Sequence, residues 1–202
     1  MRFNGEFEIE GVTTEEVWLA LSDPCMIKEA LPGCAFLVEA GEDPDFDALR
    51  EEAEAAEDPP ILPEATPEEV AERAFERGKT YAALMEVGVG NVKPSFETLA
   101  TITEREFPRM AVEVEGSAAN SSFEMSAWMK LAESDDDVTV TWEAEADIFG
   151  RIAQIGARVV NPVANRIVNQ FFDEVATRLR EAGDADESTD PESLRQRVRS
   201  LF

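Results

Sequence analysis

Apolar residues recur at steps of three and four between residues 149 and 183, which is the longest periodic pattern in the chain. The stripe consists of Ile152, Ile155, Val159, Val163, Ile167, Phe171, Val175 and Leu179. This spacing predicts a long helix with one apolar face. Arginines followed by Gly183 are typical of a helix C-terminus. Pro162 removes a backbone donor and is expected to bend or split the helix there.

Strict alternation of apolar and polar residues precedes this helix and predicts strands. Residues 138–148 give the clearest case, with valine, tryptophan and alanine on one face and threonine and glutamate on the other. Further strands are expected at 2–10, 34–40, 79–90, 96–102, 112–114 and 123–131. One apolar and one polar face predict an antiparallel sheet with one side in water. Strands followed by a covering helix make the fold class α+β.

Two short helices are expected between the first two strands. Thr13 and Glu16 have the spacing of a capping box, and Asp23-Pro24 suits the start of a second helix that ends at Pro32-Gly33. Residues 41–78 differ in kind, because they are acidic, rich in alanine and interrupted by prolines. We interpret 41–78 as an insertion that can be removed from a single domain spanning 1–182, with two short helices of its own.

The C-terminal tail combines an expected flexible, polar linker at 183–190 with a short basic amphipathic helix at 191–202. Its candidate docking residues are Leu194, Arg195, Arg197, Val198, Arg199, Leu201 and Phe202. Such a helix can bind an anionic membrane surface or a partner groove. The alternatives are a frayed terminus or a helix that folds back on the acidic body.

The charge balance is the unusual feature of the composition. The 44 acidic residues exceed the 18 basic ones and give a formal net charge of −26. A surface this acidic with an ordinary core suggests a protein from a high-salt cytoplasm, where ions screen the self-repulsion. It also argues against nucleic acid binding, because phosphates would be repelled. No signal peptide and no membrane-spanning segment are expected, so we expect a cytoplasmic protein with reduced thiols.

The residue types needed for common catalytic sites are scarce. The chain has no histidine, which excludes Ser-His and Cys-His couples and removes the commonest zinc ligand. Cys25 and Cys34 do not form a CxxC motif, and Cys34 is expected to be a structural thiol. The sequence therefore predicts no catalytic residues, no metal site and no enzyme activity.

The inward faces of the sheet and of the long helix provide the candidate binding residues. They are Met85, Val87, Phe96, Phe123, Met125, Met129, Trp142, Val163, Ile167 and Phe171. A solid core is the simplest outcome for any one of them. A curved sheet with one helix across its mouth often leaves an apolar pocket, however, and methionine-rich walls adapt to varied ligands.

Several motifs, taken in order, resemble the CoxG family of START-like proteins, named after the CoxG subunit of carbon monoxide dehydrogenase. The N-terminal ones are Val17-Trp18, Asp23-Pro24 and Leu31-Pro32-Gly33-Cys34. Val87-Gly88-Val89-Gly90 with Lys93 resembles the glycine-bend strand of that family, and Gly150, 152–156, Arg158 and 169–172 resemble its closing helix. The departures are the acidic insertion, Pro94 in place of the more usual glycine, and the tail after Gly183.

The resemblance implies a helix-grip fold, in which a seven-stranded antiparallel curved sheet wraps around the C-terminal helix. It also implies that the enclosed space binds lipid-like molecules, and a quinone fits because it is long, apolar and polar at one end. The implied role is non-catalytic: linking or recruiting a molybdenum CO dehydrogenase-type hydroxylase to the inner face of the membrane. Two alternatives stay open, a polyketide cyclase-like enzyme of the same fold and a ligand-free assembly factor for the hydroxylase.

Overall fold

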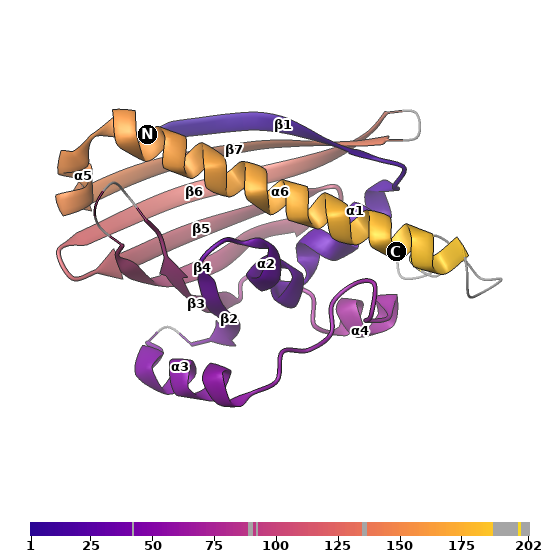
Figure 1. Ribbon diagram of the computed structural model, residues 1–202, viewed down its shortest axis with the longest axis horizontal. Coiled ribbons are helices and arrows are strands. Elements are labelled where there is room, and N and C mark those ends of the chain that lie inside the picture. The colour runs from indigo at the N-terminus through magenta and orange to yellow at the C-terminus, as the bar shows by residue number, and fades with distance from the viewer. Residues whose placement is uncertain (42, 89–90, 92, 135–136, 188–197, 199–202) are drawn as a thin grey trace.

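One seven-stranded sheet and one long helix dominate the computed structural model, which describes residues 1–41, 43–88, 91, 93–134, 137–187 and 198 (Figure 1). The strands are β1 (Arg2–Glu10), β2 (Cys34–Ala40), β3 (Thr80–Glu86), β4 (Ser95–Glu106), β5 (Arg109–Ala118), β6 (Ser121–Ser134) and β7 (Asp137–Gly150). The helices are α1 (Thr14–Ser22), α2 (Pro24–Ala30), α3 (Phe46–Ala55), α4 (Pro67–Glu72), α5 (Arg151–Ile155) and α6 (Ala157–Glu187).

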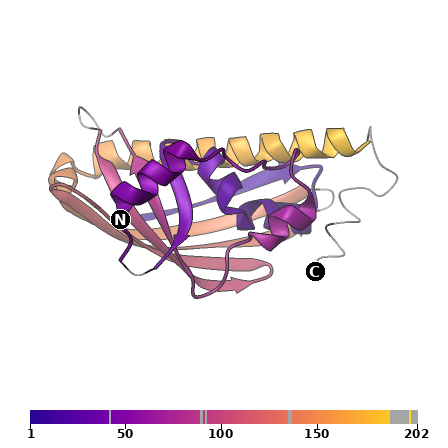
Figure 2. The ribbon, with the colours of Figure 1, turned by 90° about the horizontal axis from the view of Figure 1, so that it is seen from below.

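The sheet is an antiparallel meander, with the strand order β1-β7-β6-β5-β4-β3-β2. Its concave side faces α6, which runs diagonally across the strands, and the curvature is visible from below (Figure 2). The predicted α+β class, the seven strands and the covering helix are confirmed.

The main core lies between the sheet and the C-terminal half of α6. Val138 and Val140 of β7 are fully buried, whereas Thr139 between them is only partly buried, as strand alternation requires. Val175 and Leu179 supply the helix side of the same cluster. The apolar face predicted for the strand and the apolar face predicted for the helix therefore pack against each other in one layer.

The break in the C-terminal helix lies at Gly156 and not at Pro162, which corrects our expectation of a split at the proline. Gly156 has a φ of 86°, a conformation that glycine adopts without steric cost, and it separates α5 from α6. Pro162 lies inside α6 on an exposed face, where water can reach the carbonyl that loses its helical donor.

Strand β3 is shorter than the alternation predicted. It ends at Glu86, where the backbone N–H donates to the carbonyl of Gly33 over 2.8 Å, so Val87 lies beyond the strand. Gly33 has a φ of 84°, and a Cβ there would lie 2.1 Å from the Glu86 carbonyl oxygen. The chain needs glycine at this position because β3 passes too close for any side chain.

The two halves of the insertion pack differently. Helix α3 lies on the convex side of the sheet, where Phe46 and Leu49 contact a small cluster around Phe36, and none of its side chains is fully buried. The second half instead contributes to the main core. Its buried members are Ile61, Leu62, Ala65, Val70 and Phe75. Residues 61–75 therefore cover part of the main core, and folding without the whole insertion stays a prediction.

Candidate functional site

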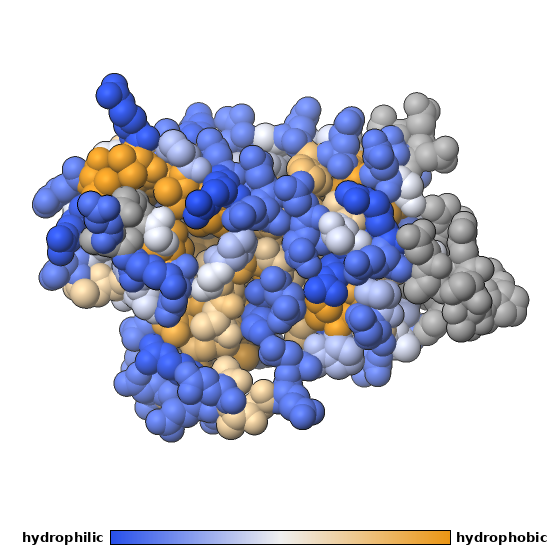
Figure 3. Space-filling model, viewed as in Figure 1, coloured by the Kyte–Doolittle hydropathy of each residue, from blue (hydrophilic) through white to orange (hydrophobic). Residues whose placement is uncertain are grey.

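A cavity of about 450 Å³ lies between the concave face of the sheet and the helices α1, α2 and α6. Strands β2 to β7 all contribute to its wall, and its lining is almost wholly apolar. In the space-filling view, apolar surface is visible below α6 among the hydrophilic residues that cover most of this face (Figure 3). The volume falls within the range of small-molecule binding sites.

Four alanines form the floor of this cavity. Ala83, Ala100, Ala127 and Ala144 come from β3, β4, β6 and β7, and all four line the cavity. Ala127 and Ala144 are direct cross-strand partners. A folded protein packs its interior densely wherever side chains can reach, so small side chains at the centre of the sheet leave the space open.

Two aromatic rings in the wall lie flat against glycines on neighbouring strands. The ring of Phe123 covers Gly116, where an added Cβ would lie 2.3 Å from Cε1. The indole of Trp142 covers Gly5, where a Cβ would lie 3.0 Å from Nε1. Both rings line the cavity, so the two glycines let large side chains press against the sheet instead of filling the cavity.

Helix α6 closes the cavity from above with aromatic side chains. Phe171 and Phe172 line it together with Val168. The rings of Phe171 and Phe172 lie 5.0 Å apart in an edge-on contact, and Phe172 also stacks on Phe7 of β1 at 5.2 Å. These ring contacts join the helix to the sheet beside the cavity and hold the roof in place.

The lining includes three polar residues, Cys34, Thr98 and Glu143. The Glu143 carboxylate forms an ion pair with Arg2, and the other two side chains donate their hydrogens within their own strands. The Thr98 hydroxyl donates to the carbonyl of Phe96, and the Cys34 thiol donates to the carbonyl of Phe36, both over 3.3 Å. Burial raises the pKa of the Cys34 thiol to about 12, so it is uncharged at neutral pH. A ligand would therefore meet a wall that offers shape and apolar contact and carries little charge.

Six of the ten candidate binding residues line the cavity. They are Met85, Phe123, Met125, Met129, Trp142 and Phe171. Val87, Phe96 and Val163 instead pack in a second apolar cluster around Ile152, at the α5 end of the helix. Ile167 is partly buried and does not line the cavity.

The floor alanines and the N-terminal contributors were missed by the sequence reasoning. Leu21, Ile27 and Leu31 line the cavity from α1, α2 and the residue after α2. The alanines carried a usable signal, because Ala83, Ala127 and Ala144 each lie two positions from a candidate and share its face of a strand. Ala100 shares that face of β4 with Phe96, four positions away. Nothing in the sequence indicated that the short helices reach the cavity.

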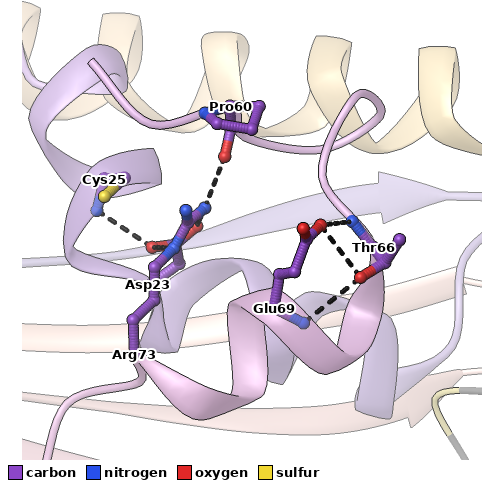
Figure 4. Close-up of polar contacts among 6 residues, drawn as sticks. All are labelled: Asp23, Cys25, Pro60, Thr66, Glu69 and Arg73. Atoms are coloured by element: carbon purple, nitrogen blue, oxygen red, sulfur yellow. Dashed lines mark hydrogen bonds and ion pairs between the residues drawn. The ribbon is translucent and has the colours of Figure 1, made fainter. Parts of the chain in front are cut away.

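A buried ion pair anchors the insertion beside the cavity (Figure 4). Asp23, between α1 and α2, is fully buried and accepts two bonds from the Arg73 guanidinium, at 2.8 and 2.7 Å. Arg73 also donates to the carbonyl of Pro60 over 2.7 Å, and Asp23 accepts from the backbone N–H of Cys25 over 3.0 Å. The pair ties both short N-terminal helices to the segment that carries Phe75, another lining residue.

Helix α4, which precedes Arg73, begins with a capping box formed by Thr66 and Glu69. Glu69 accepts from the backbone N–H of Thr66 over 2.8 Å, and the Thr66 hydroxyl accepts from the Glu69 N–H over 3.3 Å. This local structure fixes the start of the helix and so helps to orient Arg73, at its C-terminal end, toward Asp23.

The tail residues Leu194, Arg195, Arg197, Arg199, Leu201 and Phe202 lie outside the described residues. Val198 is described, and its side chain is buried in the main core. In this structure Val198 is therefore not exposed to a membrane or partner.

Among the described residues, no three or more His, Cys, Asp or Glu side chains are grouped to hold a metal ion. No helix in the described part of the chain is long and apolar enough to cross a membrane.

Comparison with known proteins places this geometry in context. The family model for the CoxG subunit of carbon monoxide dehydrogenase matches residues 73–180, more than half of the 202 residues. No curated protein matches the chain. The structure of a conserved protein from Geobacillus kaustophilus is similar at a TM-score of 0.67 and 22% identity, over 90% of this chain and 97% of that one.

Two further solved structures share the fold at lower identity. A START superfamily protein from Mycobacterium smegmatis matches at a TM-score of 0.54 and 8% identity, over 89% of this chain and 97% of that one. The Zhui aromatase/cyclase from Streptomyces sp. R1128 matches at a TM-score of 0.53 and 10% identity, over 89% of this chain and 94% of that one. These likenesses confirm the helix-grip fold.

Proposed function

The chain belongs to the CoxG family of carbon monoxide dehydrogenase subunits, and we propose that it is an accessory protein that binds a lipid-like molecule in the cavity under α6. The cavity itself is the observation that carries this proposal. An empty apolar space costs stability, because larger side chains in place of the floor alanines would bury more apolar surface, so its presence supports a binding role.

The ligand class follows from the lining. Apolar and aromatic side chains from five central strands and α6 would bind an apolar body, and the methionines can adjust to its shape. A quinone satisfies this chemistry, and its ring can stack on aromatic residues such as Trp142 and Phe171. The protein would then link a molybdenum CO dehydrogenase-type hydroxylase to its electron acceptor at the membrane.

A titration with ubiquinone-1, a short-chain quinone, tests the binding step. Quinones quench tryptophan fluorescence, and Trp142 lines the cavity from the inward face of β7. We expect saturable quenching by the unaltered chain and an affinity at least about tenfold weaker for Ala127→Phe, whose ring would occupy the floor. The matched control is Ser126→Phe, because Ser126 is exposed on the opposite face of the same strand.

The outcomes separate the proposal from its alternatives. Quenching that does not saturate with ubiquinone-1, or equal affinity in Ala127→Phe and Ser126→Phe, would show that the cavity is not a quinone site. Either result would favour an assembly factor that acts through its surface. Turnover of a polyketide substrate by the unaltered chain, lost in Ala127→Phe, would favour the cyclase-like enzyme instead.

A further inference from the structure

One segment of this very acidic protein carries no acidic residue. Residues 148–172 contain no Asp, Glu or Lys, although the chain as a whole has 44 acidic residues. The segment covers the end of β7, all of α5 and the first half of α6. Asp147 and Asp173 mark its two ends. We refer to the exposed side chains of residues 151–172, on α5 and α6, as the acid-free face.

Three arginines lie on this face. Arg151, Arg158 and Arg166 are exposed, and none of them forms an ion pair with another described residue. Arg158 and Arg166 are separated by about 12 Å along the axis of α6, from the rise of a helix. Because no carboxylate of the segment lies among them, their charge is available to a partner.

The rest of the acid-free face is apolar or amide-bearing. Val159 of α6 is 37% exposed. Phe149, at the end of β7, is 50% exposed but lies in the register of Glu145 and Asp147, on the side of the sheet away from α6, so it is not part of this face. The segment also exposes amides at Gln154, Asn161, Asn165, Asn169 and Gln170. Gln170 marks the border of the face, because it lines a shallow pocket with Glu29, Asp173 and Glu174. Helix α6 lies at the edge of the molecule, and no described element covers its outer side (Figure 2).

We propose that the acid-free face docks an acidic surface of a protein partner, which under the proposed function is the hydroxylase. Arginine is enriched in protein interfaces, whereas Lys, Glu and Asp are depleted, and this face carries three arginines and none of the depleted residues. The remainder of the chain repels an acidic partner, so approach is favoured only through this face and its arginines also fix the orientation.

The same observations favour a protein over a lipid surface. Membrane-binding basic segments carry four to eight Lys or Arg residues, and this face carries three. Interfacial helices also insert a broad apolar side, whereas the described part of this face exposes one large apolar side chain, Val159. The amides, by contrast, can pair with polar groups across a protein interface.

Binding of the full chain to the purified hydroxylase from the same organism tests the proposal. The variant Arg151→Gln, Arg158→Gln, Arg166→Gln removes the three charges. The control Arg77→Gln, Lys130→Gln, Arg180→Gln removes three exposed charges elsewhere that pair with no described residue. Both sets change the net charge equally, so only the position of the charge differs.

We expect the affinity of the hydroxylase for the triple variant of the acid-free face to fall at least about tenfold and to lose most of its salt dependence, while the control changes little. Equal loss in both variants, or none in either, would overturn the docking face and leave the proposed function intact. No binding by the unaltered chain would overturn the hydroxylase partner and the docking face together. Selective loss of binding to phosphatidylglycerol vesicles, with hydroxylase binding retained, would assign the face to the membrane and overturn the protein partner.

Discussion

Single residues decide whether the space under α6 is filled or open. Ala127 and Ala144 face each other at the centre of the floor, and Gly5 and Gly116 let two aromatic rings lie back against the sheet. Such positions were predictable as members of an inward face. The volume that they leave open was not predictable, because it depends on the distance between α6 and the sheet, which the sequence does not reveal.

Cys34 offers a test at the residue scale. Its thiol is held uncharged because burial raises its pKa from 9.0 to about 12, and only the thiolate reacts with iodoacetamide. We expect alkylation of Cys34 at pH 8 to be slow in the folded protein and fast in urea, measured by mass spectrometry on a Cys25→Ser background. Folded and unfolded rates that agree would show that the thiol is accessible.

The same pKa shift gives a stability effect with a definite sign. The folded state holds the proton more tightly than the unfolded state, so the stabilisation is complete below about pH 9 and is lost as pH rises toward 12. Unfolding free energies of the parent and Cys34→Ala should therefore differ by a constant amount below pH 9, and the parent should lose its advantage above it. A parent that gains stability between pH 9 and 12 relative to Cys34→Ala would contradict the assignment.

The Asp23–Arg73 pair gives a second residue-scale prediction. Arg73→Met would leave the buried Asp23 carboxylate without its counter-charge, which we expect to destabilise the fold by about 3 kcal/mol. Arg77→Met, four residues later and exposed, is the control and should have little effect. Urea unfolding of both variants measures the difference, and equal midpoints would show that the pair is not structural.

At the scale of elements, the sequence predicted the regular helices and strands better than the places where they break. Capping boxes at Thr13 and Thr66 were predictable, because the motif is local and both of its hydrogen bonds join residues three apart. The break at Gly156 was missed because Pro162 offered a stronger local signal. A single lost hydrogen bond on an exposed face proved compatible with a continuous helix.

The insertion shows the limit of composition as a guide. Residues 41–78 are uniformly acidic and proline-rich, yet their second half is buried in the main core and their first half is not. Burial here depends on contacts with α1 and the buried Asp23, which are distant in sequence. Composition therefore identified the segment, and tertiary contacts decided its role.

Two leucines of the insertion test this division. Leu62→Ala removes a fully buried side chain and should cost about 3 kcal/mol. Leu49→Ala removes a partly exposed side chain from α3 and should cost about 1 kcal/mol or less. Urea unfolding measures both. Equal costs would mean that the two halves are not distinct in packing.

At the scale of the whole molecule, charge dominates. A net charge of −26 destabilises the compact state through self-repulsion, and dissolved salt screens that repulsion. We expect the melting temperature to rise continuously as potassium chloride increases from dilute buffer to molar concentration. The rise should shrink near pH 4, where the carboxylates begin to protonate. A melting temperature independent of salt at neutral pH would contradict the high-salt interpretation.

The cavity, the anchored insertion and the acid-free face support the proposed role of a carrier, with one internal site and one docking surface. Of these three features the internal site is central, because the proposed accessory role of this protein depends on the molecule that it binds. The acid-free face can fail its test while the cavity remains a binding site.

Organic extraction of the protein purified from its own organism, followed by mass spectrometry, tests the central claim most directly. We predict a lipid-like molecule, of quinone type, in near-stoichiometric amount with the parent and with Ser126→Phe, and its loss from Ala127→Phe that is still folded by circular dichroism. An extract from the parent that contains no such molecule, or equal amounts from parent and Ala127→Phe, would contradict the account.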